Sequence, residues 1–169
     1  VQTNLAASMI ENAHGDIGAY YRRLCNHPYY EELEIEVEPR TVRGVLRNEY
    51  HIKGVNKKEA EETLASQKFS TGQMNCVALA VYLALAKKGI YSHNLGFLIL
   101  DDPSQNLDTT HKEALGEIVL ELVPDKQILL ATHDKELQAI LEEASRQKEP
   151  LTYRFGRCTK EGPEIRCEA

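Results

Sequence analysis

The sequence lacks any stretch that is long and apolar enough to cross a membrane as a helix. Its longest run without a charge, residues 69 to 86, includes four polar side chains within its first seven residues. A spanning helix needs about 20 mostly apolar residues. We therefore expect a protein that has no contact with a membrane.

A basic segment is also missing. The 20 Lys and Arg residues are outnumbered by 26 Asp and Glu residues, which gives a formal net charge of −6. Affinity for a nucleic-acid backbone comes mainly from clustered Lys and Arg side chains. The sequence therefore indicates no nucleic-acid surface of its own, and any contact with DNA is expected elsewhere in a larger assembly.

The four cysteines form no Cys-x-x-Cys pair, and no secretory signal pattern is present. This usage is typical of reduced thiols in a cytosolic protein. The hydrophobic fraction of 42% and the charged fraction of 27% exclude a disordered tail, a collagen-like fibre and a long coiled coil. A length of 169 residues predicts one domain with a single core.

The first half of the sequence predicts a helix followed by antiparallel strands. Apolar residues recur every three to four positions over residues 5 to 24, which indicates an amphipathic helix. Residues 32 to 38 alternate carboxylates with aliphatic side chains, the period of a half-buried strand. A second extended stretch, residues 45 to 52, predicts a hairpin. We expect a loop at 53 to 58 and a short charged helix at 59 to 68.

The second half alternates helices with short strands. A long helix is expected to follow Ser70 and to end at Gly89, and two further helices are expected to begin after the caps Asp108 and Asp134. The first strand of this half is a continuous apolar run, typical of a strand covered on both faces. The expected strands lie at residues 97 to 100, 128 to 131, 151 to 155 and 163 to 167. This order predicts an α/β fold with a mainly parallel sheet and crossover helices.

Three segments lie where an α/β sheet places ligands, at a helix N-terminus and at the carboxyl ends of strands. The first segment, residues 69 to 73, reads FSTGQ and starts the long helix. Its small residues leave backbone N–H groups open to an anion, and the Ser70 hydroxyl is a further donor. The alternative at this point is a serine that only caps a core helix.

The second segment runs from residue 97 to 108 and reads FLILDDPSQNLD. Two adjacent carboxylates at the end of a buried strand are costly unless they meet a cation, a hydrogen-bond donor or a reacting water. Asp101 is placed to hold Mg²⁺, which prefers oxygen ligands. Asp102 would face a water that attacks a phosphate. An acidic turn, with Asp108 as a simple helix cap, is the alternative.

The third segment, residues 129 to 134, reads LLATHD. His133 at the tip of this strand could donate a hydrogen bond to a terminal phosphate and sense whether that phosphate is present. The alternative is a histidine with a structural role. The other five histidines show no metal-ligand spacing.

In this order, FSTGQ, FLILDDPSQNLD and ILLATHD resemble the signature motif, the Walker B strand with its D-loop, and the switch-histidine loop of the ATP-binding-cassette (ABC) ATPases. The separation of 31 positions between Ser70 and Asp101 is similar to that in the chromosome-maintenance and DNA-repair heads, the SMC-like family. Residues 26 to 30 resemble the point where a returning coiled coil enters such a head. The resemblance implies a P-loop NTPase lobe with a mainly parallel sheet flanked by helices, a peripheral antiparallel hairpin and a coiled-coil stub.

One motif of these ATPases does not occur, the G-x-x-x-x-G-K-[ST] loop that cradles nucleotide phosphates. In the SMC-like family this Walker A loop lies in an N-terminal lobe, which a coiled coil separates from the C-terminal lobe. The resemblance implies that residues 1 to 25 are the base of the coil and residues 26 to 169 the C-terminal lobe. We expect this lobe to be inactive without the lobe that carries Walker A.

The resemblance also implies ATP and Mg²⁺ as cofactors. Asp101 would bind Mg²⁺, Asp102 would be the general base and His133 would contact the γ-phosphate. The signature residues would contact ATP bound to the opposite head, and these are Ser70, Thr71, Gly72 and Gln73. The D-loop would cross the interface between the heads, and it consists of Ser104, Gln105, Asn106, Leu107 and Asp108.

The implied function is that of an ATP-hydrolysing head that dimerises on ATP and drives a DNA-associated coiled-coil machine in repair, chromosome maintenance or defence. Its partners would be the Walker A lobe, a second head and DNA, in the cytoplasm or at a bacterial nucleoid. Thr71 replaces the usual Gly and Asp102 the usual Glu, so hydrolysis could be slow. An ATP-gated clamp or scaffold with little turnover is the main alternative. A transporter subunit and an unrelated α/β domain are the others.

Overall fold

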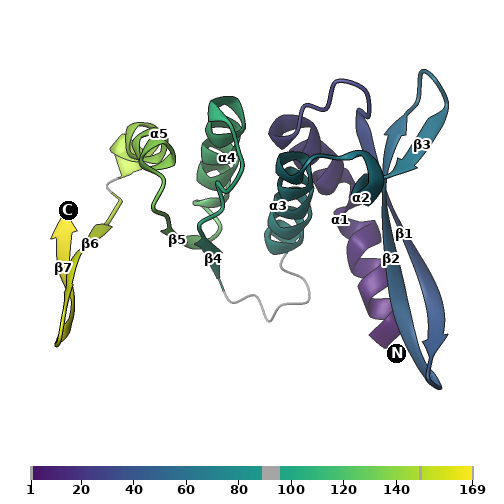
Figure 1. The fold of residues 1–169 in the computed structure, drawn as a ribbon, viewed down its shortest axis with the longest axis horizontal. Coiled ribbons are helices and arrows are strands. Elements are labelled where there is room, and N and C mark those ends of the chain that lie inside the picture. The colour runs from purple at the N-terminus through teal and green to yellow at the C-terminus, as the bar shows by residue number, and fades with distance from the viewer. Residues whose placement is uncertain (1, 89–95, 149, 169) are drawn as a thin grey trace.

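The structure is a computed structural model that describes residues 2 to 88, 96 to 148 and 150 to 168. Figure 1 shows an elongated arrangement, with a long helix and a long hairpin at one end, a short hairpin at the other, and further helices between them. The strands of this described part form three separate sheets. None of its helices combines the length and the apolar character needed to span a bilayer.

The first helix and the first hairpin follow the predicted pattern. Helix α1 spans Gln2–Leu24, and β1 (Glu32–Val42) pairs antiparallel with β2 (Val45–Asn56). Along β1, Leu33 is buried and Ile35 half-buried against the core, while the alternating Glu34, Glu36 and Glu38 face solvent. The alternation in the sequence therefore gives the expected half-buried strand.

The prediction for residues 53 to 68 is wrong in two respects. Strand β2 continues through the expected loop to Asn56, and β3 (Glu61–Leu64) occupies part of the expected helix. Strand β3 pairs with the end of β2, so that Lys53 lies opposite Leu64. Its backbone groups therefore bond to a neighbouring strand, and only α2 (Ala65–Lys68) is helical. Tertiary pairing overrides the weak local preference of this charged segment.

Helix α3 lies at the centre of the core. It spans Thr71–Lys88 and begins as predicted, while its expected end at Gly89 lies outside the described residues. Helix α3 packs along α1. The two helices contribute buried side chains to one core, and these include Ile17, Tyr20, Tyr21, Leu24, Cys76, Val77, Ala80 and Leu83.

The parallel sheet consists of β4 (Phe97–Asp101) and β5 (Gln127–Ala131), which α4 (Thr109–Leu122) connects. Helix α5 (Lys135–Ser145) follows β5 and continues as a 3-10 turn over Arg146–Lys148. This βαβ unit confirms the α/β class and the expected caps of both helices. It brings the carboxyl ends of two strands to the same edge of the sheet.

One face of this sheet is open, which corrects the expectation that the first strand is covered on both faces. Leu98 and Leu100 of β4 are 4% and 3% exposed and join the core. On the other face, Phe97 and Ile99 are 48% and 52% exposed, and Leu129 of β5 is 61% exposed. An apolar run of this kind normally has protein on both sides. The described residues supply a cover for one side only.

The last two strands form a hairpin of their own. Strand β6 (Thr152–Thr159) pairs antiparallel with β7 (Gly162–Glu168). Both closing strands occur where the sequence predicts them. Among the described residues, however, the parallel part of the fold is limited to β4 and β5, and antiparallel pairing is more extensive than expected.

Replacing Leu98 with Ala is expected to lower the free energy of unfolding by about 2–5 kcal/mol, because deleting a buried side chain leaves a cavity. The matched change Leu129→Ala, on the exposed face of the neighbouring strand, should cost less than about 1 kcal/mol. Urea unfolding followed by circular dichroism measures both. Equal losses would contradict the one-sided burial of the sheet.

Candidate functional site

The FSTGQ segment caps helix α3 through two reciprocal hydrogen bonds. The backbone N–H of Gln73 donates to the Ser70 hydroxyl oxygen over 3.2 Å, and the backbone N–H of Ser70 donates to the Gln73 side-chain oxygen over 2.8 Å. This pair is a capping box, which satisfies two N–H groups at the start of a helix. Ser70 is thus a helix cap in this lobe, and its hydroxyl keeps a proton to donate elsewhere.

The same segment packs against the D-loop. A Cβ added to Gly72 would lie 2.6 Å from the backbone oxygen of Asn106, so no larger side chain fits there without movement. One turn further along α3, the side-chain amide of Asn75 donates to the backbone oxygen of Gln105 over 2.7 Å. The signature segment and the D-loop are therefore neighbours within one lobe.

Asp102 lies at the end of β4 in a left-handed backbone conformation, with φ of 48°. Its backbone N–H donates to the oxygen of Ala131 over 2.7 Å and so extends the pairing of β4 with β5 by one residue. The turn directs the carboxylate towards the residues that follow β5. Thr132 donates its hydroxyl to one carboxylate oxygen over 3.1 Å, and His133 Nδ1 lies 2.9 Å from the other.

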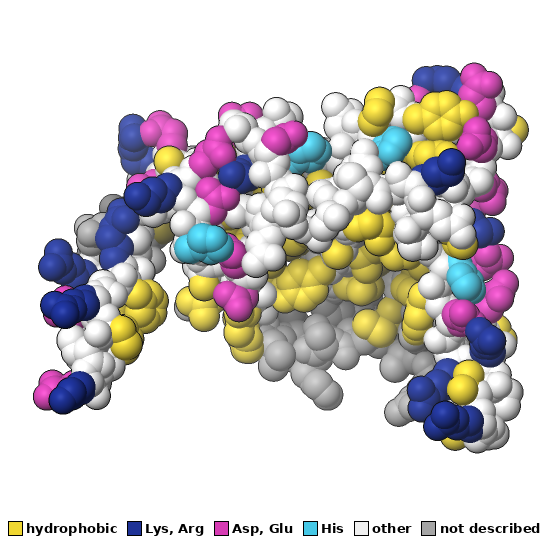
Figure 2. Space-filling view, in the orientation of Figure 1, with side chains coloured by type: hydrophobic (Ala, Val, Ile, Leu, Met, Phe, Trp, Pro, Cys, Tyr) yellow, Lys and Arg dark blue, Asp and Glu magenta, His cyan; other side chains and the backbone are white. Residues whose placement is uncertain are grey.

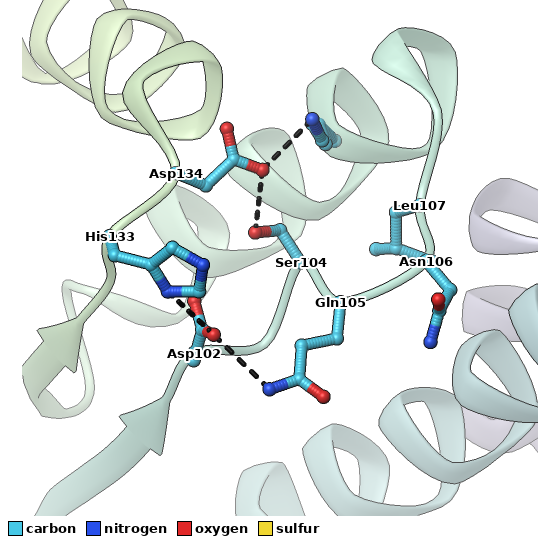
Figure 3. A pocket seen from close by; sticks show the side chains of 8 residues that line it. Asp102, Ser104, Gln105, Asn106, Leu107, His133 and Asp134 are labelled. Atoms are coloured by element: carbon cyan, nitrogen blue, oxygen red, sulfur yellow. Dashed lines mark hydrogen bonds and ion pairs between the residues drawn. The ribbon is translucent and has the colours of Figure 1, made fainter.

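Gln105 completes the surroundings of this carboxylate. Its side-chain amide donates to Asp102 Oδ2 over 3.2 Å, as Figure 3 shows. This hydrogen bond lowers the pKa of Asp102 below its ordinary value, and the bond from Thr132 and the charge of His133 act in the same direction. The Asp102 side chain is 17% exposed, whereas the His133 side chain is 85% exposed. The carboxylate is therefore held as an anion beside an accessible imidazole.

A second carboxylate, Asp134, joins the start of the D-loop to the histidine loop. Its Oδ2 accepts from the Ser104 hydroxyl over 2.9 Å and lies 2.8 Å from the Lys112 ammonium. Its Oδ1 accepts from the backbone N–H groups of Glu136 and Leu137 at the start of α5. The Lys112 ammonium, together with these hydrogen bonds, holds the pKa of Asp134 well below the ordinary range.

These residues surround a cavity of about 560 Å³. Figure 3 shows Asp102 and His133 on one side of it and the D-loop on the other. The cavity is lined by Asp102, Ser104, Gln105, Asn106, Leu107, Lys112, His133 and Asp134. The structure thus brings together residues from the second and third predicted segments, and the contacts at Gly72 and Asn75 join the first segment to them.

Asp108 and Asp101 differ from the rest of the second segment. Asp108 caps α4 by accepting from the backbone N–H of His111 over 3.0 Å, as the alternative prediction has it. Asp101 is exposed at the end of β4. No group of three or more possible metal ligands occurs among the described residues. A single carboxylate still suits Mg²⁺ bound to a nucleotide, because this ion commonly takes one or two carboxylates together with phosphate oxygens and water.

Four residues with a part in this arrangement were not singled out as site residues by the sequence. Thr132 and Asp134 flank His133, and Asn75 and Lys112 lie on helices. A polar tip after an apolar strand could have drawn attention to Thr132 and Asp134. Nothing in the local sequence indicates that Asn75 faces a loop about 30 residues away. The same holds for Lys112, which faces the start of the next helix.

The stability of the lobe should fall more steeply in acid when Asp134 is present than in the Asp134→Asn variant. Because the folded state lowers the pKa of Asp134, its contribution is complete above the ordinary carboxyl pKa of about 3.9 and is lost as the pH falls towards the folded value. Urea unfolding between about pH 5 and pH 2 measures this difference. Asp125→Asn, in the exposed turn after α4, is the control; identical profiles for all three proteins would contradict the prediction.

Comparison with known proteins finds sequence relatives among DNA-repair proteins. No family model matches the chain. The DNA double-strand break repair Rad50 ATPase of Sulfurisphaera tokodaii is 45% identical over 71 residues, which cover 40% of this chain and 8% of that protein. The DNA repair protein RAD50 of Drosophila melanogaster is 31% identical over 127 residues, covering 70% of this chain and 10% of that protein. The chain therefore spans about a tenth of the length of these relatives.

Solved structures show the same fold at low sequence identity. A structure of an SMC head bound to the C-winged helix domain of ScpA matches with a TM-score of 0.67 and 13% identity, over 95% of this chain and 43% of that one. The SMC head domain from Thermotoga maritima matches with a TM-score of 0.57 and 17% identity, over 99% of this chain and 51% of that one. The sequence relatives and the fold together support the similarity of this chain to a lobe of an SMC-like DNA-repair ATPase head.

Proposed function

We propose that this chain is the C-terminal half of an ATP-binding and ATP-hydrolysing head, which dimerises on ATP and drives a coiled-coil machine that acts on DNA. The observation that carries the proposal is the pairing of Asp102 with His133 beside a cavity whose opposite wall is the D-loop. The signature segment lies against that same loop. Such a lobe holds parts of two nucleotide sites, one on each side of the D-loop.

In its own site, the lobe positions the water that attacks the γ-phosphate. Asp102 is the general base, and the exposed imidazole of His133 donates a hydrogen bond to the γ-phosphate. Thr132 and Gln105 fix the carboxylate, so little rearrangement is needed when the water arrives. Asp101 holds Mg²⁺, which when bound neutralises charge on the phosphates.

In the opposite site, the start of α3 contacts the nucleotide of a second head. The first N–H groups of a helix have no partner within the helix, and the helix dipole favours an anion there. The capping box keeps Ser70 and Gln73 at this end, and Thr71 and Gly72 lie between them. ATP bound to one head thus holds the other head in place, and the D-loop from Ser104 to Asp108 crosses the interface.

The open face of the β4–β5 sheet supports the proposal that a partner lobe, which carries Walker A, covers it. Figure 2 shows hydrophobic side chains gathered in the hollow between the two ends of the molecule. Burying apolar surface contributes about 25 cal/mol per Å², so this face favours a protein cover over water. Its exposed side chains are Phe97, Ile99 and Leu129 on the sheet, with Tyr82 of α3 beside Ile99. In the same proposal, residues 1 to 25 are the base of the coil.

A clamp that closes on ATP and turns over little is the second candidate. It is favoured by Asp102 itself, because the family usually has Glu at this position and Asp is shorter by one methylene, about 1.5 Å of reach. Three donors already surround this carboxylate, and they lower its pKa, which makes it a weaker base. The two candidates share ATP-dependent dimerisation and differ in whether Asp102 sets the rate of hydrolysis.

Ser70→Arg in the head completed by its Walker A lobe is expected to abolish ATP-dependent dimerisation while ATP binding stays unchanged. The larger cation would fill the place of the opposite γ-phosphate without touching the head's own nucleotide. Light scattering measures the dimer, and a fluorescent ATP analogue measures binding. Ser66→Arg, an exposed serine on α2, is the matched control. Normal dimerisation of Ser70→Arg would refute the role in the opposite site.

Asp102→Asn is expected to slow single-turnover hydrolysis by about 100-fold or more, the usual contribution of a general base, while dimerisation on ATP persists. Asn keeps the shape of the side chain and loses its ability to accept a proton. Rapid-quench measurement of ADP formation by the complete head gives the rate. An unchanged rate would eliminate the general-base role and favour the clamp.

A further inference from the structure

The signature helix and the catalytic carboxylate of one lobe are linked by consecutive hydrogen bonds. The link begins at Asn75, whose amide donates to the backbone oxygen of Gln105 over 2.7 Å. It continues through the side chain of Gln105, which donates to Asp102 Oδ2 over 3.2 Å. Each end of Gln105 thus has a different partner, so the position of its backbone determines how its side chain reaches Asp102.

The surrounding contacts restrict Gln105 to this position. On its C-terminal side, the backbone oxygen of Asn106 lies against Gly72, where a Cβ would be only 2.6 Å away. Asn106 itself has a left-handed backbone, with φ of 59°. On its N-terminal side, the Ser104 hydroxyl is bound to Asp134, and Ser104 is 4% exposed. Between Ser104 and Asn106, the backbone oxygen of Gln105 is held by the hydrogen bond from the Asn75 side chain.

We propose that Asn75 is a positioning residue for Asp102 of the same lobe and acts through Gln105. This inference rests on the proposed function. The signature segment contacts the nucleotide of the opposite head, whereas Asp102 serves the nucleotide of its own head. The sequence of contacts from Asn75 to Asp102 therefore couples the two nucleotide sites of a dimer. Nucleotide bound against the start of α3 would help to hold the general base of the neighbouring site in place.

Two mixed dimers of the full-length protein separate this role from a simple effect on the signature segment. Subunits with different affinity tags are combined, and Asp102→Asn silences one of the two sites. In the first dimer, Asn75→Asp is placed in the subunit that retains Asp102. In the second dimer, Asn75→Asp is placed in the silenced subunit, so that the altered signature helix faces the active site across the interface. Asp keeps the shape of Asn and lacks its N–H donor.

Single-turnover hydrolysis in the first dimer should fall roughly 3- to 10-fold relative to a dimer with Asp102→Asn alone, the effect of losing one hydrogen bond. Hydrolysis in the second dimer should change less than about 2-fold, since its active carboxylate keeps its own Asn75. Asn75→Gln, which retains the amide donor, should lose less than Asn75→Asp in the first dimer. Ala78→Asp, an exposed position one turn along α3, controls for the added charge.

Slowing in the second dimer alone, equal slowing in both, or slowing in neither would overturn the positioning role. If the proposed function is wrong, a different result is expected. A dimer with Asp102→Asn in both subunits then hydrolyses ATP at the wild-type rate, which refutes both the general-base role of Asp102 and the positioning role of Asn75. ATP-dependent dimerisation, measured in parallel, shows that each mixed dimer has assembled.

Discussion

The parallel pairing of β4 with β5 brings Asp102, Thr132 and His133 together. Its last rung joins Asp101 to Ala131, and the backbone bond from Asp102 to Ala131 adds one residue more. The left-handed turn at Asp102 then ends the strand, so its carboxylate meets Thr132 and His133 immediately after β5. Because the polar tips come directly after the paired strands, a change in register would separate the carboxylate from the imidazole.

The helices around this sheet hold the D-loop and the loop of His133 and Asp134 in place. Lys112 of α4 binds Asp134 at the start of α5, and Asp134 in turn binds Ser104 of the D-loop. On the other side of the D-loop, α3 begins at the signature segment. Phe69, just before α3, stacks on His27 with ring centroids 4.8 Å apart and packs with Tyr21 of α1. The C-terminal end of α1 is thus in contact, through Tyr21, with the segment that is proposed to meet the opposite nucleotide.

Local signals in the sequence predicted the long helices and the caps of α4 and α5, whereas long-range contacts account for the errors, the helix expected at residues 59 to 68 among them. Asp108 and Asp134 cap their helices through neighbouring backbone groups, which the sequence alone can indicate. Strand β3 depends on its pairing with β2, and no local pattern in residues 61 to 64 reveals that partner. The apolar run at β4 correctly predicted a strand but not an open face. The three motifs indicated the site, whereas the bond from Asn75 to Gln105 required the fold.

The central claim is that this lobe is half of a head whose two nucleotide sites are completed only by a second head. The most direct test is the molar mass of the unmodified complete head, this lobe with its Walker A lobe, measured by light scattering with and without Mg²⁺-ATP. We predict that the mass doubles when ATP is added and returns to that of one head when ATP is removed. A mass that stays at one head with saturating ATP would contradict the account.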